Sequence, residues 1–129
     1  MFADTKAYSG FAVDDVQKAR QFYGETLGLQ TKMLSEEAGL MQLDLAGGER
    51  PTFVYQKPDH KPADYTILNF PVPDVDEAVR ELADRGVQFE RYEGIDQDEN
   101  GIARGQGPDI AWFKDPAGNV LSVHGDPPT

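Results

Sequence analysis

The sequence predicts an α+β fold made of two βαβββ modules in tandem, and the main sign of this is an internal repeat. The matched positions are Phe11, Val13, Asp15, Val16 and Ala19 in the first copy and, 59 residues later, Phe70, Val72, Asp74, Val75 and Ala78 in the second. Each copy continues into a helix-length stretch that stops at a glycine, Gly28 and Gly86 respectively. Two copies are too few for a solenoid. We therefore expect the two halves of one pseudo-symmetric domain, residues 1–129, whose curved mixed sheet surrounds a cleft.

Module one is expected to span about residues 6–57. Its first strand should cover residues 6–13, and Asp14 or Asp15 can cap the helix that follows, because a short acidic side chain accepts hydrogen bonds from the free N–H groups of a first turn. Gly28 is suited to the position just after that helix. The remaining strands are expected at 29–35, 40–45 and 52–57.

Module two is expected to span about residues 65–124 and to repeat this order. Its elements should be a strand at 65–72, a helix from about Asp76 to Arg85, and strands near 87–92, 109–114 and 119–124. The chain would then contain about eight strands and two principal helices. The long segment from Glu93 to Pro108 has no strand or helix pattern, and loops of that length in a compact domain are often functional.

Alternation along the strands predicts which side chains face away from the helices. In the strand at 65–72, Leu68, Phe70 and Val72 form the apolar set that should pack under the helix, so Asn69 points to the opposite face. Aromatic side chains with a few polar groups are typical of small-molecule pockets. The candidate ligand-binding residues are Tyr8, Asp44, Tyr55, Asn69, Trp112, Ser122 and His124.

The composition excludes several classes of function. The formal net charge is −11, which argues against nucleic acid or an anionic membrane surface as partner and is compatible with a cationic ligand. The absence of cysteine excludes disulfides and thiol nucleophiles. No apolar run approaches the roughly 18 residues of a membrane span, and the first residues lack a signal-peptide pattern, so we expect a cytoplasmic protein.

Three motifs carry a resemblance to a known family. They are Val13-Asp14-Asp15-Val16 followed by Ala19, Phe22-Tyr23 and Leu27-Gly28-Leu29; Leu68-Asn69-Phe70-Pro71-Val72-Pro73-Asp74; and Phe113-Lys114-Asp115-Pro116-Ala117-Gly118-Asn119. In this order, and with the βαβββ duplication, they resemble the vicinal oxygen chelate superfamily, which includes glyoxalase I, extradiol dioxygenases, bleomycin-resistance proteins and fosfomycin-resistance enzymes. The resemblance covers essentially the whole chain. Since these motifs are caps, turns and packing devices, they imply the fold and leave the reaction open.

The resemblance also implies where a metal would be held. Members with a metal place His or Gln early in the first strand, His early in the fifth, and Glu near the ends of the fourth and eighth. The matching positions here are Tyr8, Ile67, Ser122 and a residue within 52–55, none of which is His or a carboxylate. Transition metals in proteins prefer imidazole or carboxylate ligands. We therefore expect no metal and no other cofactor.

Two further patterns have more ordinary interpretations. Asp96 to Gly101 matches the first half of a calcium-binding EF-hand loop, but the twelfth position is Gly107 where a glutamate is needed. An acidic, mobile loop is the preferred interpretation. His60 lies in the polar connector between the modules and is expected to be a solvated loop residue.

Two hypotheses of different classes follow. The first is a homodimeric, non-catalytic protein that binds a small aromatic or cationic molecule in a metal-free cleft, as the resemblance to bleomycin-resistance proteins implies. The second is a lyase, isomerase or ring-opening dioxygenase with atypical or no metal ligation. In that case Asp44, Tyr8 and Tyr55 would be the acid–base groups, with Asn69 or Ser122 polarising an oxygen.

Overall fold

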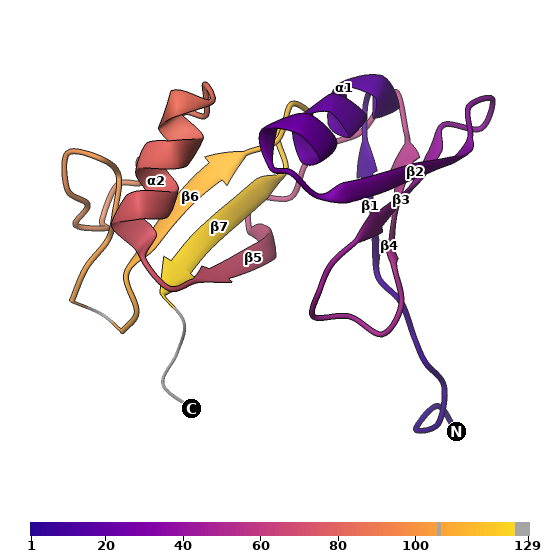
Figure 1. Ribbon diagram of the computed structural model, residues 1–129, viewed down its shortest axis with the longest axis horizontal. Coiled ribbons are helices and arrows are strands. Elements are labelled where there is room, and N and C mark those ends of the chain that lie inside the picture. Colours follow the sequence, from indigo (N-terminus) through magenta and orange to yellow (C-terminus); the bar gives the residue numbers. More distant parts are fainter. Residues whose placement is uncertain (106, 126–129) are drawn as a thin grey trace. The chain divides into compact units, whose positions relative to one another are not determined.

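The computed structural model describes residues 1–105 and 107–125, and the chain contacts divide it into two compact units. The units are Met1–Pro62 and Ala63–Thr129, which we call module one and module two. Each contains one sheet and one principal helix, shown in Figure 1. Among the described residues, none of the helices combines the length and the hydropathy that a membrane span requires.

The sheet of module one has four strands in the order β1-β4-β3-β2. The strands are β1 (Gly10–Val13), β2 (Gln30–Ser35), β3 (Leu40–Asp44) and β4 (Thr52–Gln56). β1 is parallel to β4, and the other pairs are antiparallel. The first strand is shorter than predicted: the Ser9 carbonyl still accepts a hydrogen bond from Phe53 N–H, but the Ala7 N–H already bonds locally to the Thr5 carbonyl. Tyr8 therefore precedes the strand.

The helix of module one begins as predicted and ends in a wider turn. Helix α1 (Val16–Gln21) continues into the π-helical turn η1 (Phe22–Thr26). Asp15 caps α1, since its Oδ1 accepts hydrogen bonds from two backbone N–H groups of the first turn. Gly28 follows with a φ of 74°, a conformation that favours glycine. The predicted helix start and terminating glycine are confirmed.

Module two has a three-stranded sheet in the order β5-β7-β6, with β5 parallel to β7 and β6 antiparallel to it. The strands are β5 (Thr66–Val72), β6 (Ile110–Lys114) and β7 (Val120–Gly125). Helix α2 (Val75–Asp84) starts at the cap Asp74, which accepts a hydrogen bond from Glu77 N–H. Asp74 thus caps its helix in the second copy of the repeat, as Asp15 does in the first.

The prediction of a strand at 87–92 is wrong, so the described residues contain seven strands and not the eight expected. Only one isolated bridge, from Phe89 to Phe113, is formed there. The amide of Gln97 competes for the backbone of this segment: Oε1 accepts from Tyr92 N–H at 2.8 Å and Nε2 donates to the Glu90 carbonyl at 2.9 Å. Those groups are consequently unavailable for a longer ladder with β6.

One face of each sheet forms the core beneath its helix. Met41 and Val54 are fully buried in module one, where α1 contacts β3 and β4. Phe113 and Leu121 are fully buried in module two, where α2 contacts β6 and β7. Leu68 pairs with Leu121 across β5 and β7, as the predicted alternation requires. The opposite face of each sheet carries the candidate functional residues.

Candidate ligand-binding site

Three of the predicted residues form a row across the sheet of module two. Asn69 pairs with Ser122, and Ser122 pairs with Trp112, so the three side chains share the face opposite α2. The Ser122 hydroxyl donates a 2.6 Å hydrogen bond to Asn69 Oδ1 and is fully buried. The row therefore combines a satisfied polar pair with a half-buried indole.

His124 lies one step further along the same face. It pairs with Ile110 on one side and with Pro71 on the other. Its Nδ1 lies 2.8 Å from the carbonyl oxygen of Gly125, and because a carbonyl only accepts, Nδ1 is the donor. The ring is half-buried and keeps Nε2 for another partner.

The predicted residues of module one lie on the face of its sheet that points away from α1. The Tyr8 ring packs edge-on against Phe53 with centroids 4.8 Å apart, and Tyr55 is on the same face two residues along β4. Asp44 accepts a 3.1 Å hydrogen bond from Gln42 Nε2. Tyr8 and Tyr55 are 58% and 46% exposed, so both are accessible to a ligand.

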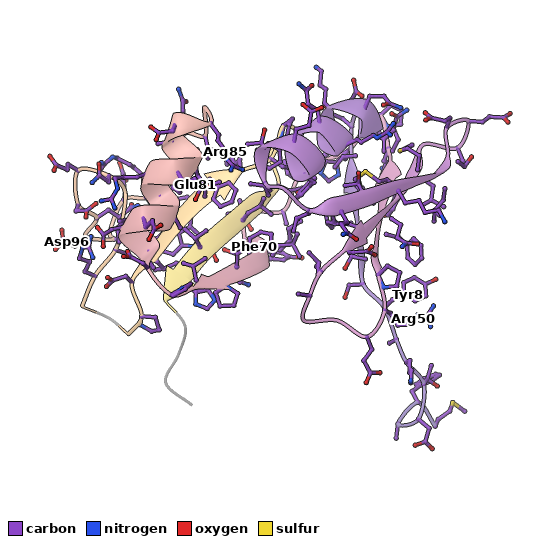
Figure 2. All side chains as sticks on the ribbon, in the orientation of Figure 1. Tyr8, Arg50, Phe70, Glu81, Arg85 and Asp96 are labelled. Carbon is purple, nitrogen blue, oxygen red and sulfur yellow. The ribbon has the colours of Figure 1, made fainter. Side chains whose placement is uncertain are left out.

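Sequence reasoning missed Arg50 on this face. Its guanidinium carbon lies 5.1 Å from the centroid of the Tyr8 ring, within the range of a cation–π contact, and Figure 2 shows the two side chains together. Arg50 Nη1 also donates to the carbonyl of Lys6. The one available signal was the place of Arg50 just before β4, the strand that pairs with β1. The Tyr8 ring is therefore already in contact with a cationic group of the same chain, the Arg50 guanidinium.

The residues at the positions where the family holds a metal do not fit one. The side chain of Ile67 has no atom that can bind a metal, and the Ser122 hydroxyl is hydrogen-bonded to Asn69 inside the module. Tyr8 is a phenol packed against Phe53 and Arg50. Within residues 1–105 and 107–125, no group of three or more His, Cys, Asp or Glu side chains could hold a metal ion. The donor set thus departs from the imidazole and carboxylate ligands that such metals prefer.

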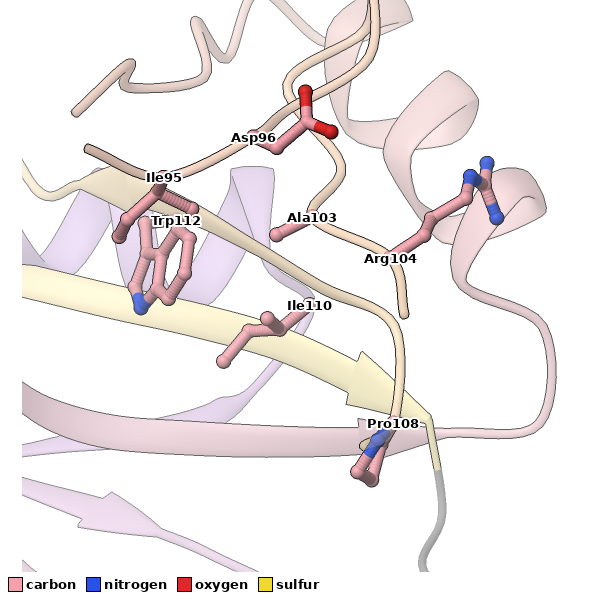
Figure 3. A pocket seen from close by; sticks show the side chains of 7 residues that line it. All are labelled: Ile95, Asp96, Ala103, Arg104, Pro108, Ile110 and Trp112. Atoms are coloured by element: carbon pink, nitrogen blue, oxygen red, sulfur yellow. The ribbon is translucent and has the colours of Figure 1, made fainter. Parts of the chain in front are cut away.

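A cavity lies beside Trp112, beneath residues 93–105 and 107–108, which we call the module-two loop. Its volume is about 300 Å³. The lining residues are Ile95, Asp96, Ala103, Arg104, Pro108, Ile110 and Trp112, shown in Figure 3. The Tyr92 ring packs edge-on against Trp112 with centroids 5.5 Å apart and so fixes the indole from outside this lining. Of these lining residues, only Trp112 had been predicted from the sequence as a ligand-binding residue, although the length of the loop was a signal.

Arg104 anchors the module-two loop to its surroundings. Its guanidinium bonds to Asp76 of α2 at 2.6 Å, to Asp109 at 2.7 Å and to Asp98 at 3.1 Å. The hydrogen bonds to Asp76 and then Asp98 raise the pKa of the Arg104 guanidinium. A bridge between Ala103 and Ile110 adds a backbone attachment to the edge of β6.

Asp98 organises the turn within the module-two loop. Its Oδ1 accepts 2.9 Å hydrogen bonds from the N–H groups of Asn100 and Ile102, and its Oδ2 accepts from Arg104. Burial would raise the pKa of the Asp98 carboxyl, but the bonds from Ile102, Asn100 and Arg104 outweigh burial and lower that pKa. A carboxylate bonded in this way has a structural role, which favours an acidic loop over calcium binding as the interpretation of this segment.

Comparison with solved structures finds the same fold in proteins of several kinds. The antibiotic binding protein TnmS3 from Streptomyces sp. CB03234 is 22% identical, with a TM-score of 0.67 over 95% of this chain and 97% of that one. A putative glyoxalase family protein from Bacillus anthracis is 20% identical, with a TM-score of 0.68 over 98% and 99%. The fosfomycin resistance protein FosX from Listeria monocytogenes is 17% identical, with a TM-score of 0.68 over 93% and 91%.

The sequence itself supports the same assignment. A search of curated proteins found no match. Residues 7–123, by contrast, match the family described as Glyoxalase/Bleomycin resistance protein/Dioxygenase superfamily. This match spans both modules, and the predicted resemblance is confirmed. The chain belongs to the glyoxalase/bleomycin resistance protein/dioxygenase superfamily.

Proposed function

We propose that this protein binds a small organic molecule, aromatic or cationic, and does not transform it. The observation that carries the proposal is the bond from Ser122 to Asn69. A serine becomes a nucleophile when its proton passes to a base, but the partner of Ser122 is an amide oxygen, which is not a base. The face of module two opposite α2 therefore offers contacts and hydrogen bonds without an activated group at this pair.

The family and its members support a binding function. TnmS3 is described as an antibiotic binding protein, and its fold matches this chain along nearly the full length of both. The metal positions implied by the resemblance carry Tyr8, Ile67 and Ser122, which suits binding better than metal-assisted chemistry. The net charge of −11 favours a ligand that carries positive charge.

The proposed contacts lie on the side of each module's sheet that faces away from its helix, with each module considered separately. They are Asn69, Trp112 and His124 in module two, where the buried Ser122 holds Asn69 through its hydrogen bond, and Tyr8, Asp44 and Tyr55 in module one. We also propose a homodimer, because strands such as β2 and β5 end their sheets with backbone groups that can pair with a second copy. Sedimentation that shows only a 14.3 kDa species at micromolar concentration would contradict the dimer.

The test is a thermal-shift screen with aromatic amines, followed by recovery of each bound compound. A ligand at a hundred times its Kd should stabilise the folded protein by about 2.7 kcal/mol, which raises the Tm by several degrees. Mass spectrometry should recover that ligand unchanged after prolonged incubation. A product of different mass would contradict the proposal. So would about one equivalent of Zn, Ni, Mn or Fe whose removal abolishes such a conversion.

A further inference from the structure

We infer that the cavity beneath the module-two loop binds an amphipathic amine, with the ammonium group at Asp96 and the apolar body against Trp112. This inference rests on the proposed binding function and gives it a ligand class and a place. The cavity lies within module two, on residues of the loop and of β6. Figure 3 shows the apolar side chains Ile95 and Trp112 together, with Arg104 extending away from them.

The size and walls of the cavity select a small apolar group. Ligand pockets in proteins hold roughly 300–1,000 Å³, so a cavity of about 300 Å³ lies at the small end of that range. Ile95, Ile110 and Trp112 supply aliphatic and aromatic walls. A single ring with a short side chain fits such a space, and an indole attracts a nearby cation through its ring face.

The two charged residues of the lining, Asp96 and Arg104, differ in whether they can bind a ligand. All five N–H groups of the Arg104 guanidinium donate hydrogen bonds to carboxylates. Nε donates to Asp98, Nη1 to Asp76 and Asp109, and Nη2 to Asp76 and Asp98. An anionic ligand would therefore have to displace a carboxylate of the protein. The Arg104 group also carries net negative charge, because three carboxylates surround one cation.

Asp96 is the charged group that remains for a ligand. Its carboxylate forms no hydrogen bond or ion pair with any other residue in the part of the chain that the structure describes. It is exposed at the edge of the cavity, near a cluster whose charge is already negative. A negative potential beside an apolar wall favours an organic cation over a neutral or anionic compound of the same shape.

The chain provides its own reporter for this site, since Trp112 is its only tryptophan. Three probes of similar shape and different charge are 2-phenylethylamine, 2-phenylethanol and 3-phenylpropionate. Each is titrated into the full-length protein at pH 7 and low salt while the Trp112 emission is followed. The amine should change the emission saturably and bind at least tenfold more tightly than the alcohol, with the propionate weakest.

Two variants of the module-two loop locate the charge preference. Asp96→Asn should weaken binding of the amine about tenfold, equivalent to roughly 1.4 kcal/mol, and leave binding of the alcohol unchanged. Glu99→Gln is the matched control, because it removes the same charge from the same loop at an exposed residue outside the cavity lining. This control should keep the affinity for the amine within twofold.

The outcomes separate this inference from the binding function on which it rests. Equal affinity for amine and alcohol, or equal losses in the Asp96→Asn and Glu99→Gln proteins, would overturn the cation site and leave small-molecule binding in place. If none of the probes changes the Trp112 emission while the thermal-shift screen finds other ligands, the cavity is not the site and the function stands. If the thermal-shift screen also finds no ligand, both the cation site and the proposed binding function are wrong.

Discussion

The two modules begin alike and diverge after their helices. In module one, α1 and its π-helical turn are followed almost directly by β2, and the sheet has four strands. In module two, a long irregular segment separates α2 from β6, and the sheet has three strands. The parts repeated in the sequence are the first strand of each module, the cap of its helix and the glycine after that helix. The part that differs supplies much of the lining of the cavity beside Trp112, so the divergence of the two copies coincides with the candidate site.

The largest loss of stability should follow removal of the Phe113 ring, against which the irregular segment of module two packs. Phe113 is fully buried and lies 5.7 Å, centroid to centroid, from Phe89, which occupies the place of the missing strand. Phe113→Ala should lower the free energy of unfolding by about 3–5 kcal/mol, because it removes a buried ring and leaves a cavity. Urea denaturation measures this loss. Tyr65→Ala, at a residue 68% exposed, is the control, and a loss below about 1.5 kcal/mol in Phe113→Ala would contradict the packing described here.

The next effect concerns the hairpin turns before the last strand of each module. In module two, buried Asp115 accepts 2.9 Å hydrogen bonds from the N–H groups of Ala117 and Asn119 and from Asn119 Nδ2. Asp115→Ala should cost about 2–3 kcal/mol, because buried donors lose their acceptor. In the turn before β4, residues 45–51, which the structure describes throughout, no carboxylate accepts such bonds, and Glu49→Ala there, at a side chain 77% exposed, should cost little. Equal losses in the two variants, measured by urea denaturation, would show that the turns are not stabilised differently.

The helix caps allow a matched test of the two modules. Asp15 accepts hydrogen bonds from two N–H groups and Asp74 from one. Helix α2 also has Asp76 and Glu77 in its first turn, where negative charge is favourable, whereas α1 has no acidic residue there. Both substitutions to alanine should lower stability by about 0.5–2 kcal/mol, with Asp15→Ala the more costly. Thermal unfolding of the two variants decides the order, and a larger loss in Asp74→Ala would reverse this comparison.

The smallest effect is confined to the module-two loop and depends on pH. The hydrogen bonds to Asp98 lower the pKa of its carboxyl against the effect of burial. A depressed folded-state pKa means that this stabilisation is present above the unfolded value of about 3.9 and is lost as pH falls through the lower folded value. The amide NMR shifts of Asn100 and Ile102, followed from pH 6 downward, should therefore titrate with a midpoint below about 3.9. A midpoint above 4 would contradict the bonding at Asp98.

Features that depend on near neighbours in the sequence could be predicted, and those that depend on distant ones could not. Asp15 and Asp74 as caps follow from local turn chemistry, and Leu68 on the core face follows from strand alternation. The strand at 87–92 was wrong because its pattern does not reveal that Gln97 will take its backbone groups.

The candidate site was only partly predictable for the same reason. Trp112 and Asn69 could be assigned to one face by alternation, whereas the cavity needs the loop folded back onto β6. The contact of Arg50 with Tyr8 likewise requires the parallel pairing of β1 with β4, which brings distant segments together.

The central claim is that this protein binds a small molecule at the cavity of module two. The most direct test is the indole N–H resonance of Trp112, the only one in the spectrum, during titration with 2-phenylethylamine. We predict that this resonance and the backbone amide of Asp96 shift together and saturate, and that both shifts weaken in Asp96→Asn. If both resonances stay fixed while amides elsewhere in the chain shift and saturate, the ligand binds at another place and the claim is wrong.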